Sequence, residues 1–451
     1  MLTFFRMYIY NWMAKSTESV NTCAGTRGRS VILSCVVVLF LLFGAQFGWS
    51  ADWPQWRGIH RDGVSAEPGL LTEWPEEGLE SLWSASVGVG ASSVAVADGR
   101  VFTMGNRDNK DVVTAFDAAK GRVLWKHEYP CAFSKRMFEG GTASTPTVDR
   151  GYVFTLSYEG DLYCLKSATG EVVWSSNLVE DLGGRPPKWG YAGSPMVIGE
   201  KLIVESGARG GAVVAFDKRS GELIWKSGNY RAGYSSPVLF KAGSDEALAV
   251  FHAYGMVGYV LSEGRELWSY RWKTDWDINA ATPIVDGNYI FLSSGYGTGG
   301  AVIDIGSGSP AEIWKSDAMA NQFGSSVLYK GNLYGFHGDA GRGKGSFRSV
   351  AFFTGAVNWK ESGLRIGGVI LVGDTLVLLT GGGELVLVQA DHRAYREIAR
   401  MQVLGGRSWA PPAYSDGRVF CRNNGGRLVV YRLGPSSGES ALLTSGTDSG
   451  Q

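Results

Sequence analysis

Polar side chains that could bind a cation or an organic ligand recur in short segments between β-rich stretches of the chain. Glu139, Asp275, Asp277 and Asn279 offer oxygen atoms of the kind that a hard cation such as calcium prefers. The Asp-x-Asp-x-Asn spacing of the last three residues is also an ordinary loop composition. The spacing therefore does not by itself identify a metal site.

Arginines and tryptophans occupy the same kind of segment. They are Trp189, Arg231, Arg365, Arg407 and Trp409. Together with the carboxylates, these side chains could hold an anionic or sugar-like planar ligand in a concave site with aromatic walls. Two other interpretations stay open: the side chains pair with one another at junctions between structural units, or they form a protein-binding surface.

Other motifs for catalysis or cofactor binding are incomplete in this sequence. The segment Gly338–Gly345 is similar to a phosphate-binding loop, but Gly345 stands where such a loop needs Ser or Thr. The five histidines lack metal-ligand spacing, and no serine lies in a G-x-S-x-G motif. Beyond residue 50, Cys131, Cys164 and Cys421 are scattered and form neither a zinc nor a haem motif.

A repeated unit separates these segments and must position them. Ala115–Trp125 and Ala215–Trp225 both have the pattern A-x-D-x-x-x-G-x-x-x-W. Looser copies end at Trp174, Trp268 and Trp314, and a last one at Trp359, with steps of 43 to 51 residues between successive tryptophans. The segments within each unit alternate or are β-branched and show no helical period. A period in the forties then predicts a β-propeller.

The number of units predicts how the ring closes. Eight units begin between Ser93 and Pro411, which indicates an all-β, eight-bladed propeller over residues 81–434. The eighth unit contains only three good strands, whereas residues 81–87 form an unmatched strand that carries Trp83. We therefore expect the N-terminal strand to complete blade eight, which removes the open sheet edges.

The recurring tryptophan is expected to dock one blade on the next. A large amphipathic ring on an outer strand buries roughly 200 Å², which corresponds to several kcal/mol at about 25 cal/mol per Å² before entropy is counted. The glycine four residues before it is expected to form a turn. The predicted docking residues are Trp83, Trp125, Trp174, Trp225, Trp268, Trp314 and Trp359.

Residues 1–50 have the features of a targeting segment. Arg27 and Arg29 precede an apolar run over residues 31–43, and Gly48 and Ser50 fit the small positions of a cleavage site. The segment is either a signal peptide or an uncleaved N-terminal anchor. In both cases we expect export, to the periplasm or the cell envelope.

The remaining regions and the charge complete the organisation. Residues 51–80 are rich in aromatics and proline, which predicts an extended collar against the propeller surface, and the Ser/Gly-rich residues 435–451 predict a disordered tail. Residues 51–451 contain 39 basic and 42 acidic residues, a net charge of −3. This balance argues against nucleic-acid binding.

These motifs resemble a known superfamily. The A-x-D-x-x-x-G-x-x-x-W units, the eight-fold count and the leader Trp53-Pro-Gln-Trp-Arg-Gly58 are similar to the pyrroloquinoline-quinone-repeat, or quinoprotein alcohol dehydrogenase-like, β-propellers. The resemblance covers roughly residues 52–434 and is closest to secreted BamB-like propellers of the planctomycete type. The superfamily contains quinone-dependent alcohol dehydrogenases as well as non-catalytic scaffolds.

The resemblance implies two functions. The first is a non-catalytic, monomeric binding or scaffold module of the envelope, with no cofactor, whose funnel face takes an envelope protein or a small polar ligand. The alternative is an alcohol or sugar dehydrogenase dependent on pyrroloquinoline quinone and calcium. Family dehydrogenases commonly carry a vicinal disulfide and often a haem domain, whereas this sequence has no Cys-Cys pair and no CxxCH motif. We therefore expect no catalytic residues, and membrane contact only through residues 1–50.

Overall fold

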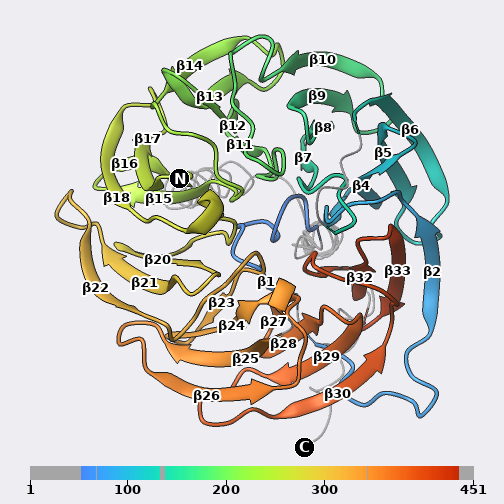
Figure 1. Cartoon of the computed structure of the whole chain (residues 1–451). Coiled ribbons are helices and arrows are strands. Elements are labelled where there is room, and N and C mark those ends of the chain that lie inside the picture. The colour runs from blue at the N-terminus through green and yellow to red at the C-terminus, as the bar shows by residue number, and fades with distance from the viewer. Residues whose placement is uncertain (1–51, 68, 133–137, 343, 436–451) are drawn as a thin grey trace, which may run out of the picture. The chain divides into compact units, whose positions relative to one another are not determined.

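The described strands form eight small sheets arranged around a central axis (Figure 1). The computed structural model describes residues 52–67, 69–132, 138–342 and 344–435, all of which lie in the second of two units, Ser50–Gln451. Apart from two single turns of 3-10 helix, η1 (Asp275–Asp277) and η2 (Ala340–Arg342), the regular elements of these residues are strands. This confirms the predicted eight-bladed, all-β propeller.

Each of the first four blades is a four-stranded antiparallel sheet whose strands follow one another from the inside outward. Blades one and two consist of β3 (Ala95–Ala97), β4 (Arg100–Arg107), β5 (Lys110–Asp117), β6 (Val123–Pro130), β7 (Thr147–Asp149), β8 (Tyr152–Leu156), β9 (Asp161–Lys166) and β10 (Val172–Asn177). Blades three and four consist of β11 (Met196–Ile198), β12 (Lys201–Ala208), β13 (Gly211–Asp217), β14 (Leu223–Ser227), β15 (Val238–Ala242), β16 (Asp245–Phe251), β17 (Gly255–Val260) and β18 (Glu266–Arg271).

The last four blades repeat this order, with two N-terminal strands added. Blades five and six consist of β19 (Ile284–Asp286), β20 (Tyr289–Ser294), β21 (Gly299–Asp304), β22 (Ala311–Ser316), β23 (Val327–Tyr329), β24 (Asn332–Asp339), β25 (Lys344–Ala351) and β26 (Val357–Ser362). Blades seven and eight consist of β1 (Val64–Ser65), β27 (Gly368–Val372), β28 (Thr375–Leu379), β29 (Glu384–Gln389), β30 (Glu397–Gln402), β31 (Ala413–Ser415), β32 (Arg418–Arg422), β33 (Arg427–Arg432) and β2 (Ser81–Ser86).

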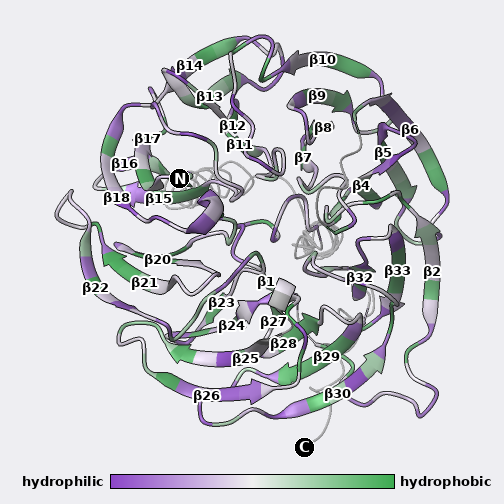
Figure 2. Ribbon diagram, in the orientation of Figure 1, coloured by the Kyte–Doolittle hydropathy of each residue, from purple (hydrophilic) through white to green (hydrophobic). Residues whose placement is uncertain are grey.

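The core lies between blades rather than at the centre of the ring. Most hydrophobic clusters combine residues of two consecutive blades, as where Trp225 of blade three meets Leu248 and Tyr259 of blade four. Second and third strands such as β13 and β29 are buried along most of their length, whereas outer strands such as β22 and β26 are mostly exposed. Figure 2 shows apolar colour along β13 and β29 and mixed colours along β22 and β26. Within the described ranges, no helix is long and apolar enough to span a membrane.

The outer-strand tryptophans contact the following blade. The indole Nε1 atoms donate hydrogen bonds of 2.7–3.1 Å to backbone carbonyls in the outer turn of that blade. The donor and acceptor pairs are Trp83 and Ala118, Trp125 and Ser167, Trp174 and Lys218, Trp225 and Leu261, Trp314 and Phe352, and Trp359 and Asp391. Trp268 instead packs in a cluster with Ile303 and Ile305 of the next blade.

The glycine of the repeated motif forms a turn and also contacts the indole of the preceding blade. Gly264 has a φ of 76°, a conformation that side chains disfavour. A Cβ atom on Gly264 would also lie 2.5 Å from Cε3 of Trp225 in the preceding blade. The same geometry joins Gly355 to Trp314. The glycine is therefore both the turn residue of its own blade and the surface on which the previous blade's indole rests.

The ring is closed by an N-terminal strand, as predicted. β2 pairs antiparallel with β33, so the first long strand of the chain is the outer strand of the last blade. Blade seven has no outer tryptophan, and Met401 of β30 takes its place against the turn that precedes β2. The backbone N–H of Leu79 donates to the Met401 sulfur at 3.2 Å, and Met401 lies directly against Gly78.

Residues 53–65 run through the middle of the ring, visible as the blue trace near the centre of Figure 1. Trp53 pairs with Val96 of blade one, Pro54 O accepts from Val148 N of blade two, and β1 pairs in parallel with β27 of blade seven. This part of the predicted collar lies inside the propeller and not around it. The physical reason is that inner strands present unpaired edge groups that this segment satisfies.

Two buried arginines fix this axial segment. Arg57 Nη1 and Nη2 donate to the carbonyls of Ser325 and Ser326 at 3.3 and 2.6 Å, and Arg61 donates to those of Ser194 and Pro195 at 3.0 and 2.9 Å. Both arginines are only 2% exposed. Burial lowers the pKa of Arg57 to about 10 and that of Arg61 to about 9. The axial segment therefore links blades three and six across the ring.

Replacing the indole of Trp225 tests whether the outer tryptophans stabilise the contact between blades. We expect Trp225→Ala to lower the free energy of unfolding by about 3–5 kcal/mol, because a large buried aromatic side chain and its hydrogen bond are lost. Trp276→Ala is the matched control, since Trp276 is 64% exposed, and it should change stability by less than about 0.5 kcal/mol. Urea denaturation followed by circular dichroism measures both, and equal midpoints would rule out blade docking by Trp225.

Replacing Arg57 tests the axial segment. Arg57→Ala leaves the buried carbonyls of Ser325 and Ser326 without their donor, and we expect a loss of about 2–4 kcal/mol in unfolding free energy. Arg209, exposed at the turn between β12 and β13, provides the control variant Arg209→Ala. Chemical denaturation of the two variants should separate them clearly. A wild-type denaturation curve for Arg57→Ala would mean that the segment does not brace the ring.

Candidate functional site

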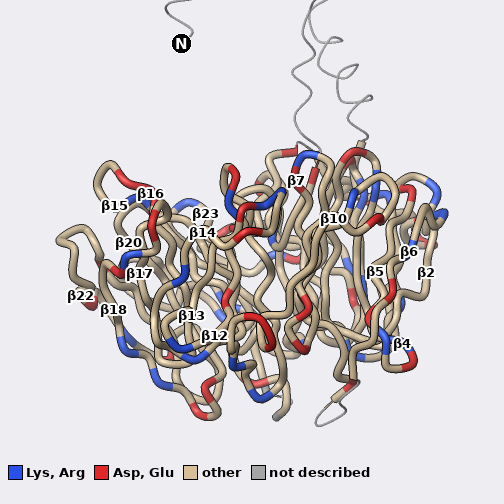
Figure 3. Tube along the Cα trace, turned by 90° about the horizontal axis from the view of Figure 1, so that it is seen from above, with Lys and Arg blue, Asp and Glu red and all other residues tan. Residues whose placement is uncertain are grey.

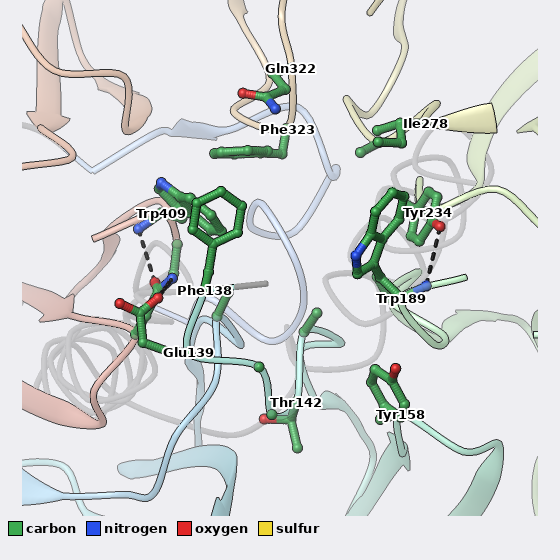
Figure 4. Close-up of a pocket in the computed structure, with 18 of the residues that line it drawn as sticks. Phe138, Glu139, Thr142, Tyr158, Trp189, Tyr234, Ile278, Gln322, Phe323 and Trp409 are labelled. Carbon is green, nitrogen blue, oxygen red and sulfur yellow. Dashed lines mark hydrogen bonds between the residues drawn. The ribbon is translucent and has the colours of Figure 1, made fainter. Parts of the chain in front are cut away.

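A concave cavity of about 250 Å³ opens where the loops entering the inner strands meet the loops between second and third strands. We call this cavity the funnel (Figure 4). Its lining is drawn from the axial segment and from the loops of every blade except the seventh. The lining residues include Trp56, Phe138, Glu139, Thr142, Tyr158, Trp189, Tyr234, Ile278, Tyr296, Gln322, Phe323, Trp409 and Asn424.

The axial segment contributes to this lining through Trp56. The indole Nε1 of Trp56 donates to Thr282 Oγ1 at 2.8 Å, which holds the ring against the inner strand of blade five. Because neighbouring residues of the same segment are bound to the inner strands of other blades, the segment obstructs the central axis. The funnel is therefore a cup that opens on one side, and Trp56 is part of its base.

Aromatic rings form two walls on opposite sides of the funnel, as Figure 4 shows. On one side, Trp409 lies 4.7 Å from Phe138 and 4.5 Å from Phe323 between ring centroids. On the other side, Trp189 lies 6.1 Å from Tyr234. Each wall combines residues of separate blades, so the ring itself sets their positions.

The carboxylate of Glu139 is paired with a guanidinium at the edge of the funnel. Arg407 Nη1 donates to both Glu139 oxygens at 2.7 and 2.6 Å, and Asn424 Nδ2 donates to Oε2 at 3.3 Å. The guanidinium also lies 4.5 Å from the centroid of Phe138 and 5.0 Å from that of Trp409. Glu139 and Arg407 remain 31% and 34% exposed, so the pair stays accessible to a ligand.

Three other predicted site residues lie outside the funnel lining. Arg231 and Asp277 form an exposed ion pair at 3.7 Å. Asp275 belongs to the same single turn, η1, in which Trp276 adopts a φ of 66°. Lys188 bridges this turn to the funnel wall, because its Nζ lies 4.5 Å from the Trp276 ring and 5.0 Å from the Trp189 ring.

Asn279 and Arg365 also lie apart from the funnel. Asn279 is completely buried, and its Nδ2 donates to the carbonyl of His252 at 2.8 Å. Its Oδ1 accepts from Thr274 Oγ1 and Ser294 Oγ at 3.2 and 2.9 Å. The side chain is thus engaged in holding the loop between blades four and five. Arg365 is exposed next to Gly382 and is not part of the lining.

The structure therefore brings Glu139, Trp189 and Trp409 together and adds residues that sequence reasoning did not select. Phe138 and Phe323 adjoin predicted segments, so their position in the loops that lead into the inner strands β7 and β23 was a usable signal. Tyr158 and Asn424 come from loops between second and third strands, where the sequence pattern contains no distinguishing feature. Trp56 was assigned to a collar, and only the path of the axial segment places it in the funnel.

Comparison with known proteins agrees with this architecture. A family model described as "Outer membrane protein assembly factor BamB" matches residues 63–132 and 109–361. The second match alone covers more than half of the chain. The chain belongs to the PQQ-repeat propeller superfamily.

Individual members of the PQQ-repeat superfamily divide between two activities. BamB of Burkholderia pseudomallei is 26% identical over 209 residues, which covers 45% of this chain and 48% of that protein. The dehydrogenase subunit of an alcohol dehydrogenase (quinone) from Gluconacetobacter polyoxogenes is 26% identical over 200 residues, or 42% of this chain and 26% of the relative. The chain thus spans less than half of each of these relatives.

A solved structure of the superfamily shows the same fold. The crystal structure of quinohemoprotein alcohol dehydrogenase from Comamonas testosteroni aligns with a TM-score of 0.62 at 16% identity, covering 87% of this chain and 82% of that one. At this identity the likeness extends to the fold alone.

The donor atoms of the funnel do not fit a calcium-bound quinone. Calcium takes about six to eight oxygen ligands, whereas Glu139 is the one carboxylate in the described lining and both its oxygens accept from Arg407. Asp275 and Asp277 lie outside the lining, and Asn279 Oδ1 is already bonded. Elsewhere in the described residues, no group of three His, Cys, Asp or Glu side chains is arranged to hold a metal ion.

Tyr234 contributes a phenolic hydroxyl to the funnel lining. Burial raises the pKa of Tyr234 to about 12, so it remains protonated at neutral pH and can donate but not act as a base. The described lining therefore combines a protonated phenol with a carboxylate that is paired with Arg407.

A second hollow of about 500 Å³ lies beside the funnel between blades five and six. His337 is part of it, and the backbone N–H of Ala320 donates to His337 Nδ1 at 3.0 Å. Burial, with the nearby Arg348, lowers the pKa of His337 to about 4. Asp317 and Lys360 face the same hollow. The neutral imidazole is thus the form that the fold accommodates.

The lowered pKa of His337 predicts an acid-sensitive contribution to stability. The unfolded chain takes up a proton near pH 6.5 and the folded chain near pH 4, so stability should fall as the pH falls through this window. His337→Asn keeps an acceptor for Ala320 N–H but does not titrate. Urea midpoints measured between about pH 7 and pH 4.5 should therefore fall more steeply for the wild type than for the variant. Parallel curves would exclude His337 as the cause.

Proposed function

We propose that this PQQ-repeat propeller is an exported, non-catalytic binding or scaffold module of the cell envelope, active as a monomer and without a cofactor. One observation carries the proposal. The funnel joins aromatic walls to a carboxylate that is fully paired with Arg407, an arrangement that binds a ligand without supplying a free general base.

The family match supports a role in the envelope. The matching family model carries the description of an outer membrane protein assembly factor, and the sequence begins with a segment of the targeting type, which lies outside the described residues. We propose export to the periplasm or envelope on these two grounds.

The surface charge supports the choice of partner. Basic and acidic residues are interspersed over the propeller, as Figure 3 shows, and the whole sequence has a net charge of zero. Such a surface gives no electrostatic attraction for nucleic acid. We propose an envelope protein or a small polar ligand as the partner, bound at the funnel face.

The alternative is an alcohol or sugar dehydrogenase that depends on pyrroloquinoline quinone and calcium. Its support is the similarity to the quinone alcohol dehydrogenases, one of which matches over 42% of the chain. Against it stands the donor set of the funnel, in which Glu139 is occupied by Arg407 and the Asp275 segment lies elsewhere.

Titration with the cofactor separates the two functions. Purified protein is mixed with pyrroloquinoline quinone and calcium, and binding is followed by calorimetry and by dye-linked oxidation of alcohols. We expect neither stoichiometric binding nor alcohol oxidation, because Glu139 is the one carboxylate in the described lining and is already paired with Arg407. Tight equimolar binding together with alcohol oxidation would overturn the proposal and establish the dehydrogenase.

Capture of envelope partners tests the binding role directly. The wild type and the variants Trp409→Ala and Trp276→Ala are immobilised and exposed to envelope extract. We expect a partner retained by the wild type and by Trp276→Ala, and lost with Trp409→Ala, because Trp409 lies in the funnel wall and Trp276 does not. Retention that is the same for all three proteins would place the interaction outside the funnel.

A further inference from the structure

The two aromatic walls of the funnel suit a ligand with two apolar faces. A pyranose ring has such faces, because its C–H groups lie above and below the ring while its hydroxyls point outward. Trp409 with Phe138 and Phe323 covers one side of the funnel and Trp189 with Tyr234 covers the other (Figure 4). Aromatic rings bury large apolar areas at low entropic cost, which favours stacking of a flat ring between them.

The polar edge of the funnel suits hydroxyl groups. A hydroxyl both donates and accepts hydrogen bonds, so it is best matched by an acceptor next to a donor. Each Glu139 oxygen accepts one hydrogen bond from Arg407 Nη1 and can accept another, because a carboxylate oxygen has two lone pairs. The Arg407 guanidinium lies beside the lining residue Phe138, so N–H donors stand next to this acceptor. Asn424, which contacts the same carboxylate, adds an amide.

The charge of the funnel selects among ligands. Glu139 and Arg407 cancel each other within one ion pair, so the described lining offers no net charge to an ionic ligand. A free carboxylate or phosphate group would lose its hydration in the funnel without gaining an unpaired counter-charge. A neutral ligand avoids this cost.

The shape of the funnel limits the size of the ligand. Its volume of about 250 Å³ lies just below the usual range for small-molecule sites, about 300–1,000 Å³. The axial segment, which includes Trp56, obstructs the central axis, so a polymer cannot pass through the ring. One or two rings at the end of a longer chain fit this space.

We infer that the funnel binds the terminal ring of a neutral carbohydrate, stacked between Trp409 and Trp189 and bonded at its hydroxyls by the Glu139–Arg407 pair. This inference rests on the proposed binding function and specifies its ligand. It makes the funnel a site for recognising glycan ends.

Titration with saccharides tests the inference. The full-length protein is titrated with glucose, galactose, N-acetylglucosamine, maltose and cellobiose, and tryptophan fluorescence and calorimetry report binding. We expect at least one of these sugars to bind with a Kd on the order of 1 mM or tighter. Trp409→Ala and Trp189→Ala should each weaken this binding at least about tenfold, a change of about 1.4 kcal/mol, whereas Trp276→Ala should leave it unchanged.

A change at Glu139 tests the preference of the funnel for neutral ligands. Glu139→Gln leaves Arg407 without its anionic partner, so we expect galacturonate to gain affinity relative to galactose in this variant and not in the wild type. Circular dichroism confirms that each variant is folded before it is titrated.

Two outcomes would overturn the inference: no binding of any of these sugars to the folded wild type, or equal weakening by Trp276→Ala and Trp409→Ala. Neither outcome bears on the proposed function, which is decided by the quinone titration and by capture of envelope proteins. A protein partner that the wild type retains while no sugar binds would assign the funnel to a polypeptide instead.

Discussion

The structure depends on contact between an outer indole ring and the turn of the next blade. A single four-stranded blade buries too little apolar surface to be stable alone, and most of its hydrophobic residues lie at the boundary with its neighbours. An indole closes the boundary after every blade except the seventh, where Met401 takes its place. At six of these boundaries the indole Nε1 atom also donates a hydrogen bond to the next blade. Because these contacts recur around the circle, the loops of distant blades meet at one place, and the funnel exists only as a result of that closure.

The axial segment turns this ring into a cup. Arg57 and Arg61 bind carbonyls of blades six and three. These backbone dipoles balance the buried charges, and for Arg57 the nearby Asp62 contributes as well. The same segment carries Trp56 to the base of the funnel. Stability and the shape of the binding site therefore depend on one stretch of about a dozen residues, which explains why so many polar backbone contacts converge on it.

The sequence predicted the fold well because propeller signals are local and repeated. The motif around Trp125 and Trp225 recurs often enough to count blades, and the missing strand of the last unit indicated the role of residues 81–87. The site was predicted less completely. Side chains in a funnel belong to different blades, so their convergence depends on the closed ring, and nothing local distinguishes Asn279, which is buried and bonded, from Glu139, which faces the cavity. The path of residues 53–65 is determined by long-range hydrogen bonds, which produce no periodic pattern in the amino-acid sequence.

The pairing of β2 with β33 joins the first long strand to the last. During synthesis, β2 is the first of the longer blade strands to emerge, and one of its edges stays unpaired until its partner β33 is made some 340 residues later. Until β33 is made, the nascent chain is an open arc with an unpaired strand edge at each end. Biogenesis of this propeller thus contains a waiting period in which two copies could exchange their first strands, and only rapid intramolecular capture of β2 yields a separate ring.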